Sequence, residues 1–587
     1  MQNQEPDFRL KHPMILQAKE NFDHFMKLLL ERCEDIPNAQ APICTGKEWD
    51  ADQLLQYEAL YQKLAACFNI TTYPNQLEIV TADQMMDAYA SIAMPVMFDH
   101  PSRGKAFLQT KQAYERGEQG LAYELVINTN PCRSYNMLEN SAAMQSLVIA
   151  HAAIGHNSFF KNNKMFKQWT DASGIMDYLR YARDYIQRCE EVIGIEPVEQ
   201  FITSCKAIEN YGVDRVKRNS EGSLSSDTDR LKEMQKTFDA LYDPLMAKAV
   251  NGLDNEKAML ERMRKRIGQS IDLSDGGHEN ILYCLEKMSP AALSSQHVNG
   301  SPWMVEVIRI MRKIAQYFYP QKQTQLMNEG WATFWHYALN HIAHHKGYVT
   351  DAQMAEILES HTGVVRQMPY NSKYYSGFNV YRLGWEMYLD IMFMADGPKS
   401  NDERRYYDEN KYAETFAHSK VYQNGKATPL LGSDWLDALH YAMENHRDDE
   451  FVNQYLSLGV SKNFKMFSIN DSDNNEHLLV NGTQANLDQI RESLGKQYCI
   501  SNREADINVV EFDVYGDQIF RMKHTAEDGV QLNEQHVVEV MKHINVLLRG
   551  PRALGTDNFT GFRAELETVD VRDPENPKVI TYGKRRG

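Results

Sequence analysis

The chain has 587 residues, of which 43% are hydrophobic and 10% aromatic, and its 63 basic and 80 acidic residues give a formal net charge of −17. This composition can form more than one hydrophobic core and excludes a disordered chain. The acidic balance argues against broad nonspecific binding to nucleic acid or anionic lipid, which needs a basic surface. We expect no transmembrane helix, because no run of 18 apolar residues exists, and no secretory signal, because charged residues interrupt the first thirty positions. A cytoplasmic protein is therefore predicted.

The eight cysteines are spread over the whole length, and no two form a C-x-x-C pair. A disulfide framework or a cysteine-based zinc site would need closer or paired spacing. We expect reduced thiols that are mostly buried.

The first 455 residues are predicted to be mainly helical. Hydrophobic residues recur there at spacings of three and four, with few helix breakers. The segments with this pattern are 14–30, 50–68, 83–92, 141–160, 173–191, 196–210, 228–248, 302–317, 329–346 and 351–360. Two polar stretches, 217–227 and 271–300, predict surface loops around a helical insertion at about 217–300.

The composition changes after about residue 455. Patterns of β-strands and helices then alternate, in the order 464–469, 477–480, 485–494 (helix), 507–514, 518–523 and 534–548 (helix). This order predicts a small α+β domain with an antiparallel sheet over 456–550, followed by a tail over 551–587. The predicted fold class is α+β, with a large, mainly α-helical domain over 1–455.

The segment from Ala150 to Asn163 has the highest density of chemically active side chains. His151 and His156 are five residues apart, about 140° on an ideal α-helix, whereas zinc-binding helices place histidines four apart. A π-bulge, or a helix that ends at Gly155, could bring both to one ion. The alternative is structural, with one histidine hydrogen-bonded in the core and the other capping the helix.

A second segment, Asn328 to His336, strengthens the metal interpretation. Glu329 and His336 are seven apart, so a carboxylate and an imidazole lie on one helix face two turns apart. Together with His151 and His156, Glu329 predicts a set of metal ligands that suits zinc, or iron or manganese if more carboxylate joins.

A loop from Tyr370 to Tyr381 is rich in Tyr, Asn, Ser and Gly. Its tyrosines, Tyr375 among them, could donate to a substrate oxyanion, although the same rings could simply pack. The sequence has no Walker A loop, no dinucleotide fingerprint after a strand and no G-x-S-x-G elbow, which weakens nucleotide-binding and serine-hydrolase hypotheses.

The two segments look like those of a distant relative of the gluzincin metallopeptidases that have a His-Glu-x-x-Pro-Gly-His helix and a later Glu-Gly-Trp-Ala segment. This likeness implies a metallopeptidase-like helical domain in which His151, His156 and Glu329 bind the metal. In that pattern a glutamate follows the first histidine and acts as general base, and Ala152 stands in its place here. Peptidase chemistry would need another base, such as Glu124, Glu139 or His336.

Longer motifs resemble the SpoVR family (stage V sporulation protein R) over about residues 10 to 550. They are Met94–Met97, Gly120–Asn128, Ala150–Asn163, Tyr211–Arg215, Tyr317–Thr324 and Asn328–His336. The chain departs from the family pattern at Asp99–Lys105, where Pro101 and Arg103 replace two aromatic residues. The resemblance implies a cytosolic protein of sporulation or of stationary-phase and stress physiology. It also implies two partners, a PrkA-type AAA+ serine kinase and a von Willebrand A-like protein.

Two functions therefore stay open. The first is a metal-dependent hydrolase, in which His336 or Glu124 works as acid or base and Tyr375 contacts the substrate. The second is a non-catalytic adaptor or regulatory partner of the kinase system, which the alanine at position 152 favours. Nucleic-acid binding is not expected, because the basic cluster at 262–266 lies among acidic residues.

Overall fold

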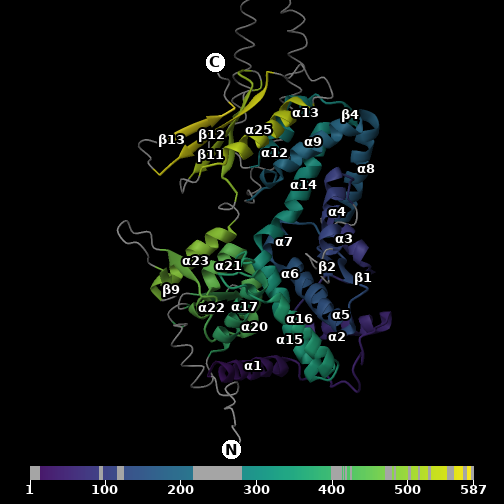
Figure 1. Ribbon diagram of the computed structural model, residues 1–587, viewed down its shortest axis with the longest axis vertical. Helices are drawn as coiled ribbons and strands as arrows, with labels where there is room; N and C mark the ends of the chain where they lie inside the picture. Colours follow the sequence, from purple (N-terminus) through teal and green to yellow (C-terminus); the bar gives the residue numbers. More distant parts are fainter. Residues whose placement is uncertain are drawn as a thin grey trace, which may run out of the picture. The chain divides into compact units, whose positions relative to one another are not determined.

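The computed structural model describes residues 13–90, 97–115, 124–215, 280–397, 419–423, 426–469, 479–481, 484–499, 504–512, 516–526, 531–551, 561–572 and 578–583, with the single residues 413, 416 and 514 (Figure 1). The helix predicted over 228–248, the basic cluster at 262–266 and most of the insertion at 217–300 lie outside these residues. Contacts divide the chain into two compact units, each made of two sequence segments. Unit 1 contains residues 1–181 and 320–503, and unit 2 contains residues 182–319 and 504–587.

Unit 1 is mainly helical. Its first segment contains α1 (Pro13–Arg32), α2 (Ala51–Cys67), β1 (Asn75–Val80), α3 (Ala82–Ala90), α4 (Pro101–Glu115), β2 (Glu124–Ile127), β3 (Cys132–Met137), α5 (Ala142–Val148), the π-helix η1 (Ile149–His156), α6 (Asn157–Asn162), α7 (Lys164–Trp169) and the start of α8 (Ile175–Ile193). Its second segment contains α15 (Gln325–His345), α16 (Asp351–Val364), α17 (Val380–Asp396), β6 (Lys420–Gln423), β7 (Lys426–Pro429), α20 (Trp435–Asn445), α21 (Asp448–Tyr455), α22 (Leu458–Asn463), β8 (Phe467–Ile469), β9 (Leu479–Asn481) and α23 (Gln484–Tyr498).

The central element of unit 1 is α15. Its residues Trp331, Phe334 and Trp335 are fully buried in the main hydrophobic core, and the helix packs against η1 and α17. Asp448 fixes its start, because the two carboxylate oxygens accept from the backbone N–H groups of Leu326 and Met327, each at 2.9 Å. These N–H groups have no partner inside the helix, so the carboxylate satisfies them and complements the helix dipole.

A three-stranded sheet in the order β1-β3-β2 precedes the π-helix. Strand β3 pairs with β1 in parallel and with β2 in antiparallel register. Gln145 on α5 joins the sheet to the helical run, since its side chain accepts from Asn136 and donates to the Met137 carbonyl. The start of the histidine-bearing helix is thereby tied to the end of β3.

Unit 2 combines helices with a four-stranded sheet. The helical elements are most of α8, α9 (Ile195–Ala207), η2 (Glu209–Tyr211), α12 (Ile281–Met288), α13 (Pro290–Leu293), most of α14 (Trp303–Gln323) and α25 (Glu534–Arg549), and a short hairpin joins β4 (His297–Val298) to β5 (Ser301–Pro302). The sheet has the order β10-β11-β12-β13, formed by Ile507–Phe512, Ile519–Ala526, Arg563–Asp570 and Lys578–Tyr582.

The predicted fold class is confirmed: a mainly helical part is followed by a smaller α+β part with antiparallel strand pairs. Three details differ from the expectation. The central pair β11–β12 is parallel, and residues 551–587, expected as a tail, contribute β12 and β13 to the sheet. The contacts divide the chain at 503/504, whereas the sequence suggested a boundary near 455.

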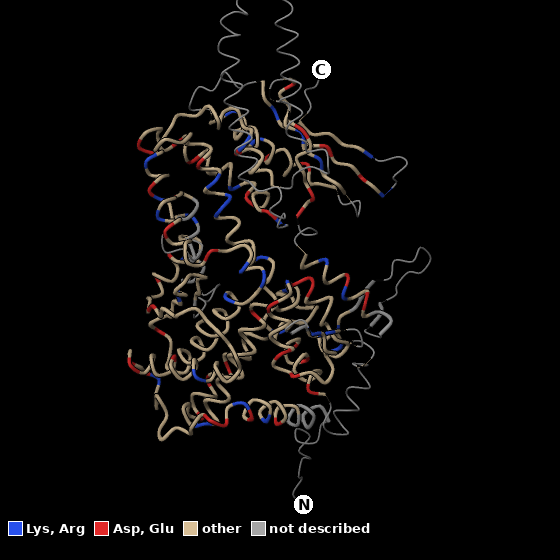
Figure 2. Tube along the Cα trace, turned by 180° about the vertical axis from the view of Figure 1, so that it is seen from behind, with Lys and Arg blue, Asp and Glu red and all other residues tan. Residues whose placement is uncertain are grey.

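Charges are mixed along the molecule. Figure 2 shows Lys and Arg interleaved with Asp and Glu along the described trace. Within the described part of the chain, no helix combines the length and apolar character needed to cross a bilayer. All eight cysteines are free thiols.

Candidate metal centre

His151 and His156 lie on the π-helix η1, between α5 and α6. A π-helix closes its hydrogen bonds between residues five apart, so side chains at that spacing come onto one face. The chain adopts the π arrangement and continues past Gly155 into α6, rather than ending there. Both histidines are buried, with 5% of each residue exposed.

Two glycines allow the helices around the site to approach closely. A Cβ atom on Gly155 would lie 2.6 Å from Cα of Ala332 on α15, and one on Gly330 would lie 2.5 Å from backbone atoms of Gly384 on α17. Any side chain at either position would force the helices apart. Because Glu329 lies three residues before Ala332 on α15, the contact of Gly155 with Ala332 brings the Glu329 carboxylate close to the two histidines.

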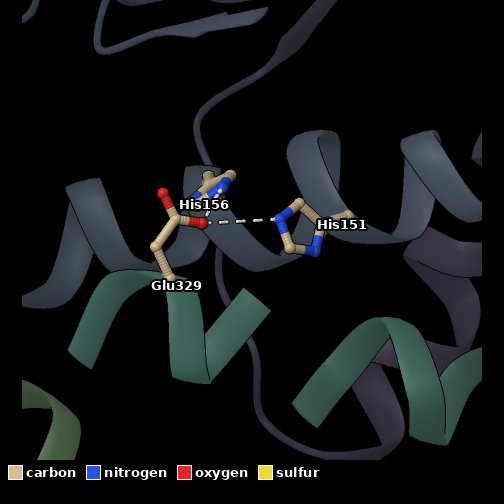
Figure 3. Close-up of side chains that lie close together, drawn as sticks. All are labelled: His151, His156 and Glu329. Carbon is tan, nitrogen blue, oxygen red and sulfur yellow. Dashed lines mark ion pairs between the residues drawn. The ribbon is translucent and has the colours of Figure 1, made fainter. Parts of the chain in front are cut away.

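The side chains of His151, His156 and Glu329 converge from the two helices (Figure 3). Glu329 Oε2 lies 3.4 Å from His156 Nε2 and 3.8 Å from His151 Nε2, and the three atoms are within 4.8 Å of one another. These separations are too long for good hydrogen bonds. They suit ligands of one ion, because two atoms each about 2.0–2.2 Å from a zinc ion lie roughly 3.3 Å apart.

Glu329 Oε2 is buried and has no hydrogen-bond partner among the described residues. Burial alone would raise the pKa of Glu329, but the neighbouring imidazoles of His156 and His151 outweigh it and lower that pKa to about 2. The group is therefore a carboxylate at neutral pH. A buried anionic oxygen without a donor is costly unless a cation compensates it.

The other ring nitrogen of His156 has a partner that fixes its tautomer. His156 Nδ1 lies 2.8 Å from Asn328 Oδ1, which can only accept, so Nδ1 carries the proton. Nε2 then presents its lone pair toward Glu329. Outer partners of this kind orient metal-ligating histidines.

A chain of three histidines supports His151 in the same way. His151 Nδ1 lies 2.8 Å from His336 Nδ1, and His336 Nε2 lies 2.9 Å from His361 Nδ1. Burial and the adjacent histidines, His151 first, lower the pKa of His336 well below 6.5, so this ring is neutral. If Nδ1 of His151 donates to His336, and Nε2 of His336 donates to His361, every ring carries one proton and Nε2 of His151 presents its lone pair toward Glu329.

The donor set suits zinc or iron. Two imidazoles and one carboxylate form a known three-ligand zinc arrangement that leaves a fourth position for water or substrate. The same two histidines and one carboxylate also form the ligand set of non-haem iron(II) centres. Among the described residues, no fourth His, Cys, Asp or Glu joins the cluster.

A cavity of about 530 Å³ opens beside the cluster. Its wall includes His151 and His336, and the α16–α17 loop and the first turn of α17 contribute residues from Arg366 to Tyr381. The Tyr381 ring is stacked toward His151, with centroids 6.4 Å apart. This volume lies in the usual range for small-molecule sites, about 300–1,000 Å³.

The other predicted catalytic residues lie in different settings. His336 supports His151 through its ring nitrogens and also lines the cavity. Tyr375 packs on Tyr370, with ring centroids 4.9 Å apart, whereas the cavity wall is formed by residues 376–381 of this loop. Glu139 is exposed and accepts from the Ala82 backbone N–H. Glu124 begins β2, but its side chain lies outside the described residues.

Sequence reasoning did not assign roles to Asn328 or His361, and it considered Tyr381 only as one of several tyrosines of the loop. Asn328 adjoins the predicted ligand Glu329, and that adjacency was a usable signal, since histidine ligands need an outer acceptor. His361 is 25 residues from His336 and on another helix, so only the fold could reveal their contact.

Comparison with known proteins gives a consistent result. The family model described as SpoVR like protein matches residues 48–503, and the model described as SpoVR-like C-terminal domain matches residues 505–547. Uncharacterized protein YcgB of Escherichia coli (strain K12) is 41% identical over 505 residues, which cover 86% of this chain and 91% of that protein. No solved structure matches.

Proposed function

The chain belongs to the SpoVR family, and from the geometry of its His151, His156 and Glu329 side chains we propose that it is a metal-dependent hydrolase that binds one zinc ion. The observation that carries the proposal is the convergence of two imidazole Nε2 atoms on a buried carboxylate oxygen that has no hydrogen-bond donor among the described residues. A zinc ion in such a site supplies Lewis-acid chemistry, which polarises a carbonyl group and activates water.

Other residues of the site orient the histidine ligands and contact the substrate. Asn328 and the His336–His361 pair hold the two histidine ligands in one tautomer and one orientation. Tyr381, at the cavity wall beside His151, is positioned to contact the substrate. In hydrolysis, the oxygen of water bonds to the acyl carbon, the C–N or C–O bond breaks, and one proton of that water passes to the leaving group.

The proton acceptor for water cannot be the residue after His151, because that position is Ala152. We propose Glu124 for this role, as the sequence suggested. Glu124→Gln should then reduce hydrolysis by about 10²-fold or more without loss of metal.

Metal analysis tests the proposal most directly. Protein purified without chelator should contain about one zinc ion per chain. The variants His151→Ala, His156→Ala and Glu329→Gln should lose it while keeping their circular dichroism spectrum. His344→Ala is the matched control, since His344 lies on α15 but pairs with Asp351 at 2.8 Å. Only trace metal in the wild type, or metal retained in all three ligand variants, would refute the site.

Ala152 also favours a second function, a metal-containing adaptor or regulatory partner without hydrolytic activity. The family resemblance suggests the partners, a PrkA-type AAA+ serine kinase and a von Willebrand A-like protein, in sporulation or stress physiology. Affinity capture from stationary-phase cells tests this function. Recovery of the kinase with wild type, and equally with Glu124→Gln, would support it; recovery of neither partner would count against it.

A further inference from the structure

We propose that the cavity beside the metal centre binds small acyl compounds that carry a carboxylate, and that Arg366 is the residue that recognises this carboxylate. This inference rests on the proposed function for the position of the reacting group. The binding of the anion itself can be tested independently of the metal.

The described residues that line the cavity carry a net positive charge. Arg366 belongs to it, and among the described side chains that line it there is no aspartate or glutamate. This absence is notable in a chain with 17 more acidic than basic residues. A metal ion held by His151 would add positive charge at another point of the same wall.

Arg366 has no acidic partner within salt-bridge distance among the described residues, and its side chain is exposed at the cavity. Most arginines described in this chain pair with a carboxylate, as Arg382 does with Glu386. An unpaired guanidinium at a pocket is available for a ligand, and its planar fork matches a carboxylate with two parallel hydrogen bonds.

The backbone around Arg366 is held in place by two amide side chains. Asn379 Nδ2 donates to the carbonyls of Val364, at 2.7 Å, and of Arg366, at 3.2 Å. Gln367 donates to the carbonyl of Gly377 and accepts from the backbone N–H of Asn379. Arg366 therefore lies on a loop whose backbone is held by hydrogen bonds. This lowers the entropy cost of ordering the loop around a ligand.

The rest of the wall suits a small acyl compound. Apolar side chains from Leu147, Val148, Met368 and Phe378 line the space between the polar groups. A molecule bound by its carboxylate at Arg366 would lie across these side chains, with its amide or ester near His151. One guanidinium without a second cation among the described lining residues favours a carboxylate over the doubly charged phosphate group.

The first arm of the test uses metal-free protein. Binding of 3-phenylpropionate, 3-phenylpropionamide and phenyl phosphate is measured by ligand-observed NMR titration. We expect the carboxylate to bind about tenfold more tightly than the amide, and Arg366→Ala to abolish this difference. Lys373→Ala is the control, because it removes a positive charge from the same loop outside the cavity wall. Equal binding of acid and amide would overturn the inference, and tighter binding of phenyl phosphate would overturn the choice of a carboxylate.

The second arm uses zinc-loaded protein with acetohydroxamate and succinate monohydroxamate, measured by calorimetry. The anionic hydroxamate should bind about tenfold more tightly in the wild type, and Arg366→Lys should keep part of that preference. If neither hydroxamate binds but the acid preference holds in the first arm, the metal site fails and the anion site stands. If both hydroxamates bind equally well and the first arm shows no preference, the metal site stands and the role of Arg366 is refuted.

Discussion

Glu286 on α12 and Glu329 on α15 are glutamates with little exposure, 2% and 19% of the side chain, but their carboxylates have different neighbours. Glu286 accepts from Lys287 at 3.0 Å, from Arg309 at 3.2 Å and from Arg312. Among the described residues, the ion-pair partners of Glu329 are imidazole nitrogens, at 3.4 and 3.8 Å. The carboxylate of Glu286 is thus paired with Lys and Arg side chains, whereas no described Lys or Arg pairs with that of Glu329.

The two groups have lowered pKa values for different reasons. Burial would raise the pKa of Glu286, but Arg312, Lys287 and Arg309 outweigh it. For Glu329, burial would likewise raise the pKa, but His156 and His151 outweigh it and lower that pKa. Unperturbed histidines titrate near neutral pH, unlike lysine and arginine. The comparison teaches that a buried carboxylate surrounded by permanent cations stabilises a fold, whereas one that faces imidazoles is suited to bind a metal ion.

The largest expected effect is on unit 2. Glu286→Ala should lower the free energy of unfolding by about 3 kcal/mol, because Arg309 and Arg312 lose their shared buried partner. Urea unfolding followed by circular dichroism measures it, and metal content should not change. Glu539→Ala, which removes an exposed pair with Lys542, should leave the midpoint where it is. A change in metal content in Glu286→Ala would contradict the distinction between a structural role for Glu286 and a metal-binding role for Glu329.

The next effect concerns metal removal. Zinc at one hundred times its dissociation constant should stabilise the wild type by about 2.7 kcal/mol, so a chelator should lower the melting temperature. The chelator should have no effect on Glu329→Gln. Equal melting temperatures of the wild type with and without chelator would contradict the proposal that Glu329 helps to bind a metal ion.

Gly155→Ala tests the close packing of η1 on α15. Its Cβ would clash with the backbone of Ala332, so we expect a loss of about 2 kcal/mol and weaker metal binding. Gly363→Ala on α16 is the control, since no atom lies within 4 Å of its Cβ position, and it should change stability by less than about 1 kcal/mol. Normal zinc content in Gly155→Ala would show that the ligand geometry does not depend on this contact.

The smallest effect should come from Glu329→Gln without metal. Its stability should change by less than about 1 kcal/mol, because Glu329 Oε2 accepts no hydrogen bond from the described residues. Denaturant titration of the chelator-treated variant and wild type measures this difference. A loss as large as that of Glu286→Ala would mean that Glu329 is a structural residue.

Much of the fold could be predicted from the sequence, because helical periodicity is a local property. The patterns at 50–68, 329–346 and 351–360 correspond to α2, α15 and α16. Strand β12 was missed although Ala564, Leu566 and Thr568 alternate with polar residues and are buried, because charged neighbours gave 551–587 the composition of a tail.

The three predicted metal ligands could be named from residue types, but their geometry could not be derived from spacing. The π-helix is stable only in the context of the packing around it, and the contact of His361 on α16 with His336, which in turn contacts His151, depends on the fold. Tyr381 rather than Tyr375 lies beside His151 because of the path of the loop, which the composition of that loop does not determine.

The π-helix has one further consequence, for the tolerance of this region to insertions and deletions. Before it, the Ser146 hydroxyl lies 2.6 Å from that of Tyr61; after it, Asn157 donates to the Tyr73 carbonyl and Ser158 accepts from Trp331. Inserting or removing one residue in η1 with its turns otherwise unchanged would rotate one flank relative to the other, and one set of these contacts would be lost. The length of η1 is thus constrained by side chains outside the cluster of His151, His156 and Glu329.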